Sequence, residues 1–249
     1  MNPVLEEIER SGQMILPSGE SVKVHSNVGL GSGGVLQRAI EVAKPQLACE
    51  VGLAFGISSL YILDAMQRHG NGRLIGMDPA QHDGTWRGGG LFNLERAGFA
   101  NQYEFHEETS QRVLPRLAAA ETRIQFGFID GWHTFDHTLV DFFYIDQMLD
   151  PGGVVVLDDV GYPGLRRLAH FIVTNRDYEI LDFDPIPQTH TWKQPAKRAI
   201  QKLLFPLVRD NFSPDRHAVA IKSVVDRACL IALRKRGDDH RRFDHFVPF

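Results

Sequence analysis

The chain has 249 residues, of which 43% are hydrophobic and 23% charged, and its formal net charge is −4; this is the composition of a globular protein that buries one sizeable core. It contains no long apolar run, and its acidic, polar N-terminus lacks the order of a secretory signal, so we expect a cytoplasmic protein without a membrane span. Its two cysteines, Cys49 and Cys229, both stand in apolar runs. This argues against a disulfide framework or a thiolate metal cage and predicts two buried core residues.

Apolar runs of strand length alternate with segments of helical period between about residue 35 and residue 183. We expect strands at 46–51, 73–77, 102–106, 124–129, 153–157, 178–183 and 228–233. We expect helices at 34–43, 58–68, 91–97, 110–119, 134–149 and 164–174. Such alternation is typical of repeated βαβ units, and it predicts an α/β protein with a doubly wound, seven-stranded, mostly parallel sheet.

The predicted elements form a single domain over residues 1–249, with a cap segment at 1–33. Residues 185–225 break the alternation with several prolines and a basic amphipathic stretch, so we interpret them as an insertion between the sixth and seventh strands. From Lys193 to Asp244 the chain carries 13 Lys or Arg against 6 Asp or Glu. The basic part fits a solvated face, packing on the domain or on a second subunit, a substrate lid or a membrane surface, and nucleic acid is the weaker alternative.

A loop with two glycines, Glu50 to Ser58, follows the first predicted strand. In open α/β sheets, ligands bind outside the carboxyl ends of the strands, where Gly52 and Gly56 would let a ligand approach the backbone. Gly56 and Ser58 also stand at the start of a predicted helix, whose free N–H groups favour a ligand carboxylate. The spacing G-x-x-x-G lacks the third glycine of a dinucleotide loop, which disfavours a nicotinamide cofactor. A plain strand-to-helix turn is the alternative.

Carboxylates follow three of the predicted strands. Asp78 ends the second strand, where a carboxylate can accept hydrogen bonds from ribose hydroxyls; a turn or cap residue is the alternative. Asp130 ends the fourth strand, and Asp158 and Asp159 end the fifth. Crowded carboxylates are costly unless a cation or a proton joins them, so these three predict a site for a hard divalent cation such as Mg²⁺. For Asp158 or Asp159 a helix cap is the alternative.

In chain order, these features resemble the class I S-adenosylmethionine-dependent methyltransferases, and within them the metal-dependent catechol and caffeoyl-coenzyme A O-methyltransferases, over roughly residues 34–160. The resemblance implies a Rossmann-like fold with an antiparallel last strand, S-adenosyl-L-methionine and a divalent metal as cofactors, and a small-molecule acceptor with a hydroxyl group. Positions that match the cofactor-binding motifs of the family are Glu50, Gly52, Gly56, Ser58, Asp78, Ser110, Gln111, Asp130 and Trp132. Positions that match its metal ligands are Asp130, Asp158 and Asp159.

Two positions depart from the catechol enzymes. Asp159 stands where they carry an asparagine, and its extra charge could tighten metal binding or change the preferred metal. His133 stands where they carry a lysine, three residues after the first metal aspartate. An imidazole titrates near neutrality, so His133 is the candidate general base, with Asp130 beside it in the catalytic set; a plain helix-start residue is the alternative. A zinc pair with His137 would lack a third nitrogen or sulfur ligand.

The predicted function is metal-assisted O-methylation of a small-molecule hydroxyl. Two alternatives stay open: a metal-independent N- or C-methyltransferase, and a catalytically silent methyltransferase-like binding module whose basic C-terminal part binds an anionic partner. Family relatives are often dimers, so a homodimer is compatible with the resemblance.

Overall fold

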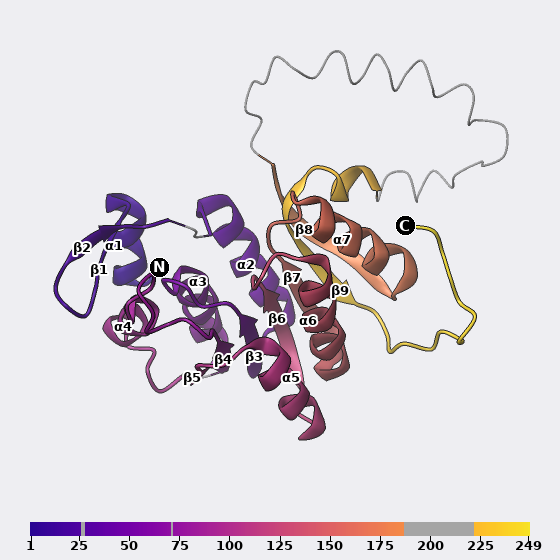
Figure 1. Cartoon of the computed structure of the whole chain (residues 1–249), viewed down its shortest axis with the longest axis horizontal. Helices are drawn as coiled ribbons and strands as arrows, with labels where there is room; N and C mark the ends of the chain where they lie inside the picture. Colours follow the sequence, from indigo (N-terminus) through magenta and orange to yellow (C-terminus); the bar gives the residue numbers. More distant parts are fainter. Residues whose placement is uncertain (26–27, 71, 187–221) are drawn as a thin grey trace, which may run out of the picture.

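A seven-stranded sheet lies at the centre of the computed structural model, which describes residues 1–25, 28–70, 72–186 and 222–249 (Figure 1). Its strands are β3 (Leu47–Val51), β4 (Arg73–Met77), β5 (Tyr103–His106), β6 (Ile124–Ile129), β7 (Leu149–Leu157), β8 (Tyr178–Pro185) and β9 (Ala228–Lys235). They lie in the order β5-β4-β3-β6-β7-β9-β8; β9 runs antiparallel to both of its neighbours, and the other pairs are parallel. The predicted fold class is confirmed. The strand order reverses between β3 and β6, which is where open α/β sheets bind ligands.

Helices cover both faces of this sheet (Figure 1). They are α2 (Leu30–Ala43), α3 (Ile57–Met66), α4 (Gly89–Arg96), α5 (Ser110–Ala119), α6 (Phe135–Met148) and α7 (Pro163–Asn175), and the short 3-10 helix η1 (Gln67–His69) follows α3. Alternate residues of a strand enter different cores. Val154 and Val156 of β7 belong to the core that contains α2 and α3, whereas Val155 and Leu157 belong to the core that contains α6 and α7. Strands buried on both faces are continuous apolar runs, which explains their clear signal in the sequence.

The predicted and observed elements differ most at α2, which begins at Leu30 rather than at residue 34, and at β7. Elsewhere the agreement is close: the strands Arg73–Met77 and Ile124–Ile129 and the helix Ser110–Ala119 have the predicted bounds. The sequence predicts that β7 begins at residue 153, after a Pro-Gly-Gly turn, but the strand begins at Leu149. The register between β6 and β7 shifts after Ile124, so the additional residues form an irregularity that tolerates proline within a strand.

The first 33 residues contain elements that the sequence patterns do not predict. Helix α1 (Pro3–Ser11) begins after Asn2, whose side-chain oxygen accepts a hydrogen bond from the Val4 N–H at 3.0 Å. The strands β1 (Gln13–Ile15) and β2 (Ser21–Lys23) form a separate antiparallel pair. Apolar side chains of this segment join the core on the α3 side of the sheet, namely Val4, Leu5, Ile8, Met14 and Leu16. Strands of three residues are too short to give a periodic signal.

The predicted insertion at 185–225 lies almost wholly outside the described residues, which resume at Lys222. Pro185 ends β8, and residues 222–225 are helical before β9 begins. Within the described ranges, no helix has both the length and the apolar composition needed to cross a membrane.

Candidate active site

The carboxyl ends of β3, β6 and β7 lie side by side at one edge of the sheet. Backbone hydrogen bonds continue past the strand ends: the Asp130 N–H donates to the Val51 carbonyl at 2.9 Å, and the Asp158 N–H donates to the Ile129 carbonyl at 3.1 Å. These bonds bring together the loops that follow the three strands. The glycine loop, the predicted base and the predicted metal ligands therefore share this edge.

Two glycines of the loop after β3 have left-handed backbone conformations. Gly52 has a φ of +91°, and a Cβ atom on it would lie 2.1 Å from the Asp130 carbonyl oxygen. Gly56 is the N-cap of α3 with a φ of +76°, and a Cβ atom on it would lie 3.0 Å from the Gly90 carbonyl oxygen. The protein's own backbone thus requires both glycines. Close approach of a cofactor to them stays a prediction.

Glu50 lies at the end of β3 and is fully buried. Its carboxylate accepts hydrogen bonds from the hydroxyl of Ser58 at 2.5 Å and from the hydroxyl of Ser59, both in the first turn of α3. Burial raises the pKa of Glu50 to about 7, although the two serine hydroxyls oppose this shift. Glu50 and Ser58 therefore join β3 to α3, and their contact with a cofactor stays a prediction.

In Glu50→Gln, the free energy of unfolding should fall less with rising pH than it does in the wild-type protein. The pKa of Glu50 is about 7 in the folded protein, against 4.5 for an exposed glutamate, so the folded state binds the proton more tightly. The contribution of Glu50 to the free energy of unfolding is fully present at a pH below its pKa of 4.5 in the unfolded chain. This contribution is lost as the pH rises through about 7, and the loss is at most about 3 kcal/mol. Urea unfolding at pH values of about 5 and about 8 measures the effect. Equal pH dependence in both proteins would contradict it.

Asp78 fixes the same loop from the end of β4. Its carboxylate accepts hydrogen bonds from the backbone N–H groups of Leu53 at 3.1 Å, Ala54 at 2.9 Å and Ala80 at 2.9 Å. Ala54 has a φ of +47°, which is unfavourable for a residue with a side chain, so Asp78 holds a strained turn. Of the two interpretations of Asp78, the structure therefore shows the turn role. Ribose binding through the remaining lone pairs stays a prediction.

Three further residues that match cofactor positions follow β5 and β6. Ser110 is the buried first residue of α5, and Gln111 beside it is half-buried. Trp132 is 72% exposed, and its ring centroid lies 6.4 Å from that of His137. Their positions at the carboxyl ends of neighbouring strands suit a flat ligand, and the contact itself stays a prediction.

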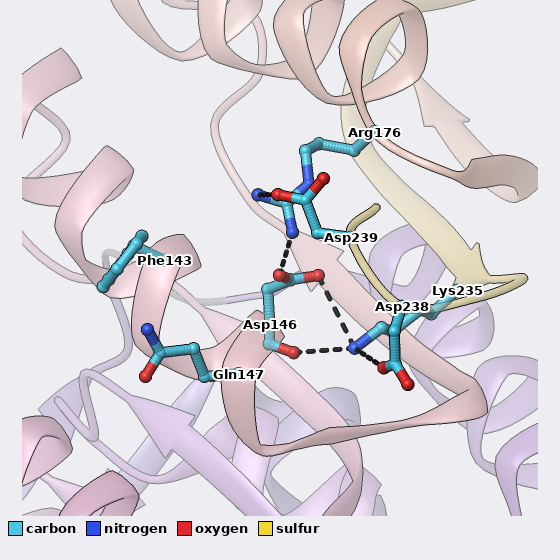
Figure 2. A pocket seen from close by; sticks show the side chains of 7 residues that line it. All are labelled: Phe143, Asp146, Gln147, Arg176, Lys235, Asp238 and Asp239. Atoms are coloured by element: carbon cyan, nitrogen blue, oxygen red, sulfur yellow. Dashed lines mark hydrogen bonds and ion pairs between the residues drawn. The ribbon is translucent and has the colours of Figure 1, made fainter. Parts of the chain in front are cut away.

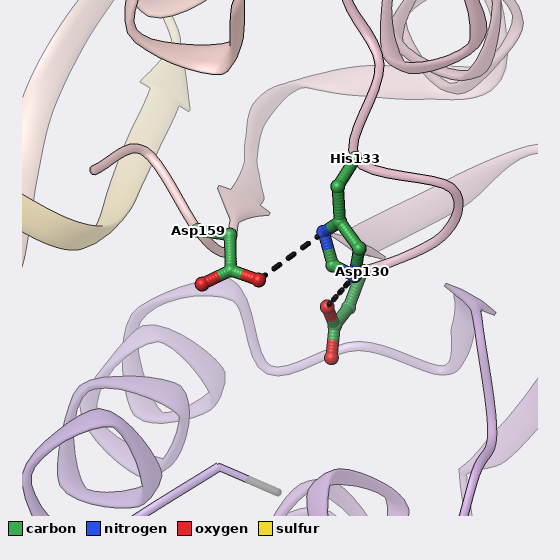
Figure 3. Close-up of side chains that lie close together, drawn as sticks. All are labelled: Asp130, His133 and Asp159. Carbon is green, nitrogen blue, oxygen red and sulfur yellow. Dashed lines mark ion pairs between the residues drawn. The ribbon is translucent and has the colours of Figure 1, made fainter. Parts of the chain in front are cut away.

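His133 lies between two of the predicted metal ligands (Figure 3). Its Nδ1 atom lies 3.2 Å from a carboxylate oxygen of Asp159, and its Nε2 atom lies 3.8 Å from one of Asp130. His133 and Asp159 both have a φ of +53°. Residues with side chains adopt this left-handed conformation at a cost, and such residues concentrate at functional sites. The structure thus brings the predicted base together with Asp130 and Asp159, whereas Asp158 lies with Asp159 and Cys229. We call Asp130, Asp158 and Asp159 the acidic cluster.

The electrostatics of the acidic cluster favour a proton or a cation. Burial raises the pKa of Asp130 well above its usual range, and the charges of Asp158 and Asp159 raise it further. Burial also raises the pKa of Asp158 to about 7, against the effect of a hydrogen bond from the Asp159 N–H. Among the described residues, no lysine or arginine forms an ion pair with the cluster, and its basic neighbour is the imidazole of His133. Carboxylate oxygens without a compensating charge fit a hard divalent cation.

Two residues lie beside the acidic cluster although the sequence does not predict that position for them. Tyr162, just before α7, is 54% exposed, and its ring centroid lies 6.1 Å from that of His133. Cys229 is half-buried next to the cluster, so the prediction of a buried core residue is wrong for Cys229, whereas Cys49 is fully buried. The apolar run around Cys229 predicts the strand but not its direction. Because β9 is antiparallel, its first residues reach the edge at which the parallel strands end.

A charged pocket lies at the other edge of the sheet, between α6, α7 and the end of β9 (Figure 2). The Asp146 carboxylate accepts hydrogen bonds from Arg176 and, at 2.6 Å, from the Tyr178 hydroxyl. The ammonium group of Lys235 donates to the Asp146 carbonyl at 2.8 Å, and Arg176 also pairs with Asp239 at 3.3 Å. These paired charges join two helices to β9, which is a structural role.

Comparisons with known proteins find similarity to methyltransferases. A family model for a methyltransferase domain matches residues 49–160. Among solved structures, the O-methyltransferase TomG from Streptomyces achromogenes, involved in tomaymycin synthesis and in complex with SAM, is 19% identical with a TM-score of 0.57, covering 73% of this chain and 82% of that chain. An O-methyltransferase from Bacillus cereus in complex with SAH is 18% identical with a TM-score of 0.57, covering 73% and 83%. A comparison with curated proteins gives no significant match.

The segment that matches the family model begins at β3 and ends just after the acidic cluster, at Val160. It therefore contains the glycine loop, Asp78, His133 and all three carboxylates of the cluster. The similar solved structures share the fold of the described sheet and helices. Residues 49–160 therefore match a methyltransferase domain, and the described part of the chain has the fold of the two similar O-methyltransferase structures.

Proposed function

We propose that the protein transfers a methyl group from S-adenosyl-L-methionine to a hydroxyl group of a small molecule. The observation that carries this proposal is the position of His133, whose imidazole lies between Asp130 and Asp159 at the carboxyl edge of the sheet. The methyltransferase domain supports methyl transfer. The two similar solved structures, both of O-methyltransferases and bound to SAM and SAH, support the cofactor and an oxygen acceptor.

The residues that would hold S-adenosyl-L-methionine follow the ends of β3, β4, β5 and β6. Gly56 begins α3, and the free N–H groups of this helix start favour the carboxylate of the ligand. Asp78 keeps the loop after β3 in place and retains lone pairs for the ribose hydroxyls. Flanking positions for the adenosyl part are supplied by Glu50, Gly52, Ser58, Ser110, Gln111, Asp130 and Trp132.

The acidic cluster would hold a divalent cation, with Mg²⁺ as the first candidate, because its ligands are carboxylate oxygens. A bound cation of this kind lowers the pKa of an acceptor hydroxyl and orients its oxygen. The cation would also offset the repulsion among Asp130, Asp158 and Asp159, which have no lysine or arginine partner among the described residues.

His133 takes the role of general base. The Asp159 carboxylate, 3.2 Å from Nδ1, would keep the proton on that nitrogen, which leaves the Nε2 atom a lone pair that can accept the proton of the acceptor hydroxyl. As this proton moves to Nε2, the oxygen attacks the sulfonium methyl in line; the C–O bond forms, the S–C bond breaks, and its electron pair stays on sulfur. Asp159 and Asp130 stabilise the resulting imidazolium, and Asp159 fixes the ring orientation.

Calorimetric titration of S-adenosyl-L-methionine tests this proposal. We expect roughly micromolar binding by the wild-type protein and its loss in Asp78→Ala, because this change leaves the N–H groups of Leu53 and Ala54 without their acceptor and releases the loop after β3. Asp83→Ala is the matched control, since Asp83 is an exposed aspartate in the loop after β4. Absence of binding to the wild-type protein would contradict the proposed function.

A further inference from the structure

The register of the sheet places Cys229 beside the acidic cluster. Strand β9 is antiparallel to β7, and Leu157 pairs with Ile231. The same pairing continued past the end of β7 brings Asp159 opposite Cys229. The Val160 N–H donates to the Cys229 carbonyl at 2.7 Å, which fixes this approach. The Cys229 thiol therefore lies at the edge of the sheet that carries the carboxylates, because β9 is antiparallel to its neighbours.

The acidic cluster and its neighbours offer two sets of donor atoms. In the first set, one atom each of Asp130, His133 and Asp159 lie within 4.8 Å of one another. In the second, one carboxylate oxygen each of Asp158 and Asp159 and the Cys229 sulfur lie within the same distance. Asp159 belongs to both sets. The first set offers oxygen and nitrogen, and the second offers oxygen and sulfur.

These donor sets differ in the cations that they suit. Hard cations such as Mg²⁺ bind oxygen and have little affinity for sulfur, whereas thiolates bind Zn²⁺, Co²⁺ and related borderline or soft cations. We propose that Asp158, Asp159 and Cys229 form a second cation position, selective for thiophilic divalent cations. Binding releases the Cys229 thiol proton to solvent as the bond between sulfur and the cation forms.

The second position shares Asp158 and Asp159 with the proposed Mg²⁺ position, so a cation bound at one position affects the other. A cation held on the Cys229 side engages the Asp159 carboxylate and competes with its contact to His133, which is 3.2 Å long. A thiophilic cation should therefore inhibit methyl transfer. This consequence rests on the proposed function, whereas the cation position itself rests on the donor atoms.

Addition of Co²⁺ to the metal-free, full-length protein tests the position directly. We expect a thiolate-to-cobalt absorption band in the near ultraviolet that saturates close to equimolar Co²⁺. In Cys229→Ser the band should vanish, and the affinity for Co²⁺ should fall by about tenfold or more. Cys49→Ala removes a fully buried thiol and should keep the band. Asp130→Asn should also keep it, since Asp130 belongs to the first set of donors alone.

Three outcomes would overturn the inference: no band in the wild-type protein, a band that survives in Cys229→Ser, or a band that disappears in Asp130→Asn while the fold is intact by circular dichroism. Calorimetry with S-adenosyl-L-methionine on the same metal-free protein separates this inference from the proposed function. Cofactor binding without the band contradicts the thiophilic position alone. The band without cofactor binding contradicts the proposed function alone.

Discussion

Replacement of His133 by alanine should lower kcat for methyl transfer by roughly 10²–10⁴-fold, with little change in the affinity for S-adenosyl-L-methionine. The imidazole is the group placed to accept the hydroxyl proton, because Asp159 engages its Nδ1 atom and Nε2 faces the acidic cluster. Without the imidazole, the proton of the acceptor hydroxyl must be transferred to water. Stopped or continuous assays with a catechol as trial acceptor measure kcat, and calorimetry measures cofactor affinity.

His137→Ala is the matched control for this experiment. His137 lies one helical turn further along, is half-buried, and its Nδ1 atom lies 2.8 Å from the Thr134 hydroxyl oxygen rather than near the acidic cluster. Its removal should leave kcat within about threefold of the wild-type value, a difference of less than 1 kcal/mol. If His133→Ala retained wild-type kcat, His133 would be a helix-start residue and not the base.

The sequence predicts the sheet well because its signal is local. The runs Arg73–Met77 and Ile124–Ile129 are apolar along their length, since both of their faces are buried, and turn residues mark their ends. The segment Gln13–Ile15 has no comparable signal, because a strand of three residues is too short to show an alternation of apolar and polar side chains. The bulge that lengthens β7 depends on its pairing with β6, which no local pattern contains.

The candidate site is less predictable, because it depends on which strands are neighbours. Asp130 and Asp159 can be recognised as residues after strands, but their shared contact with His133 requires β6 and β7 to be adjacent and parallel. The position of Cys229 depends on the direction of β9, which the family resemblance implies but the pattern of a buried strand does not, because that pattern is the same in either direction. The three N–H bonds to Asp78 likewise follow from the strained turn at Ala54 and not from a motif.

Asp130→Asn should remove the stabilisation of the protein by Mg²⁺ and lower methyl transfer by about 10³-fold or more. Loss of a metal ligand costs several kcal/mol of transition-state stabilisation, and about 4 kcal/mol corresponds to 10³ in rate. In the wild-type protein, Mg²⁺ at about 100 times its Kd should raise the free energy of unfolding by about 2.7 kcal/mol. Urea unfolding with Mg²⁺ and with EDTA measures this difference in both proteins.

In EDTA the order of stability should reverse, with Asp130→Asn more stable than the wild-type protein, because asparagine removes one of three crowded charges that no lysine or arginine of the described residues offsets. Asp136→Asn is the control, since Asp136 is exposed and pairs with His137. A stabilising mutation that abolishes activity is the signature of a binding site, since a residue that serves the fold alone cannot give it. If Mg²⁺ did not change the free energy of unfolding of the wild-type protein, and if that protein transferred methyl groups in EDTA, the metal-independent alternative would replace the metal-assisted one.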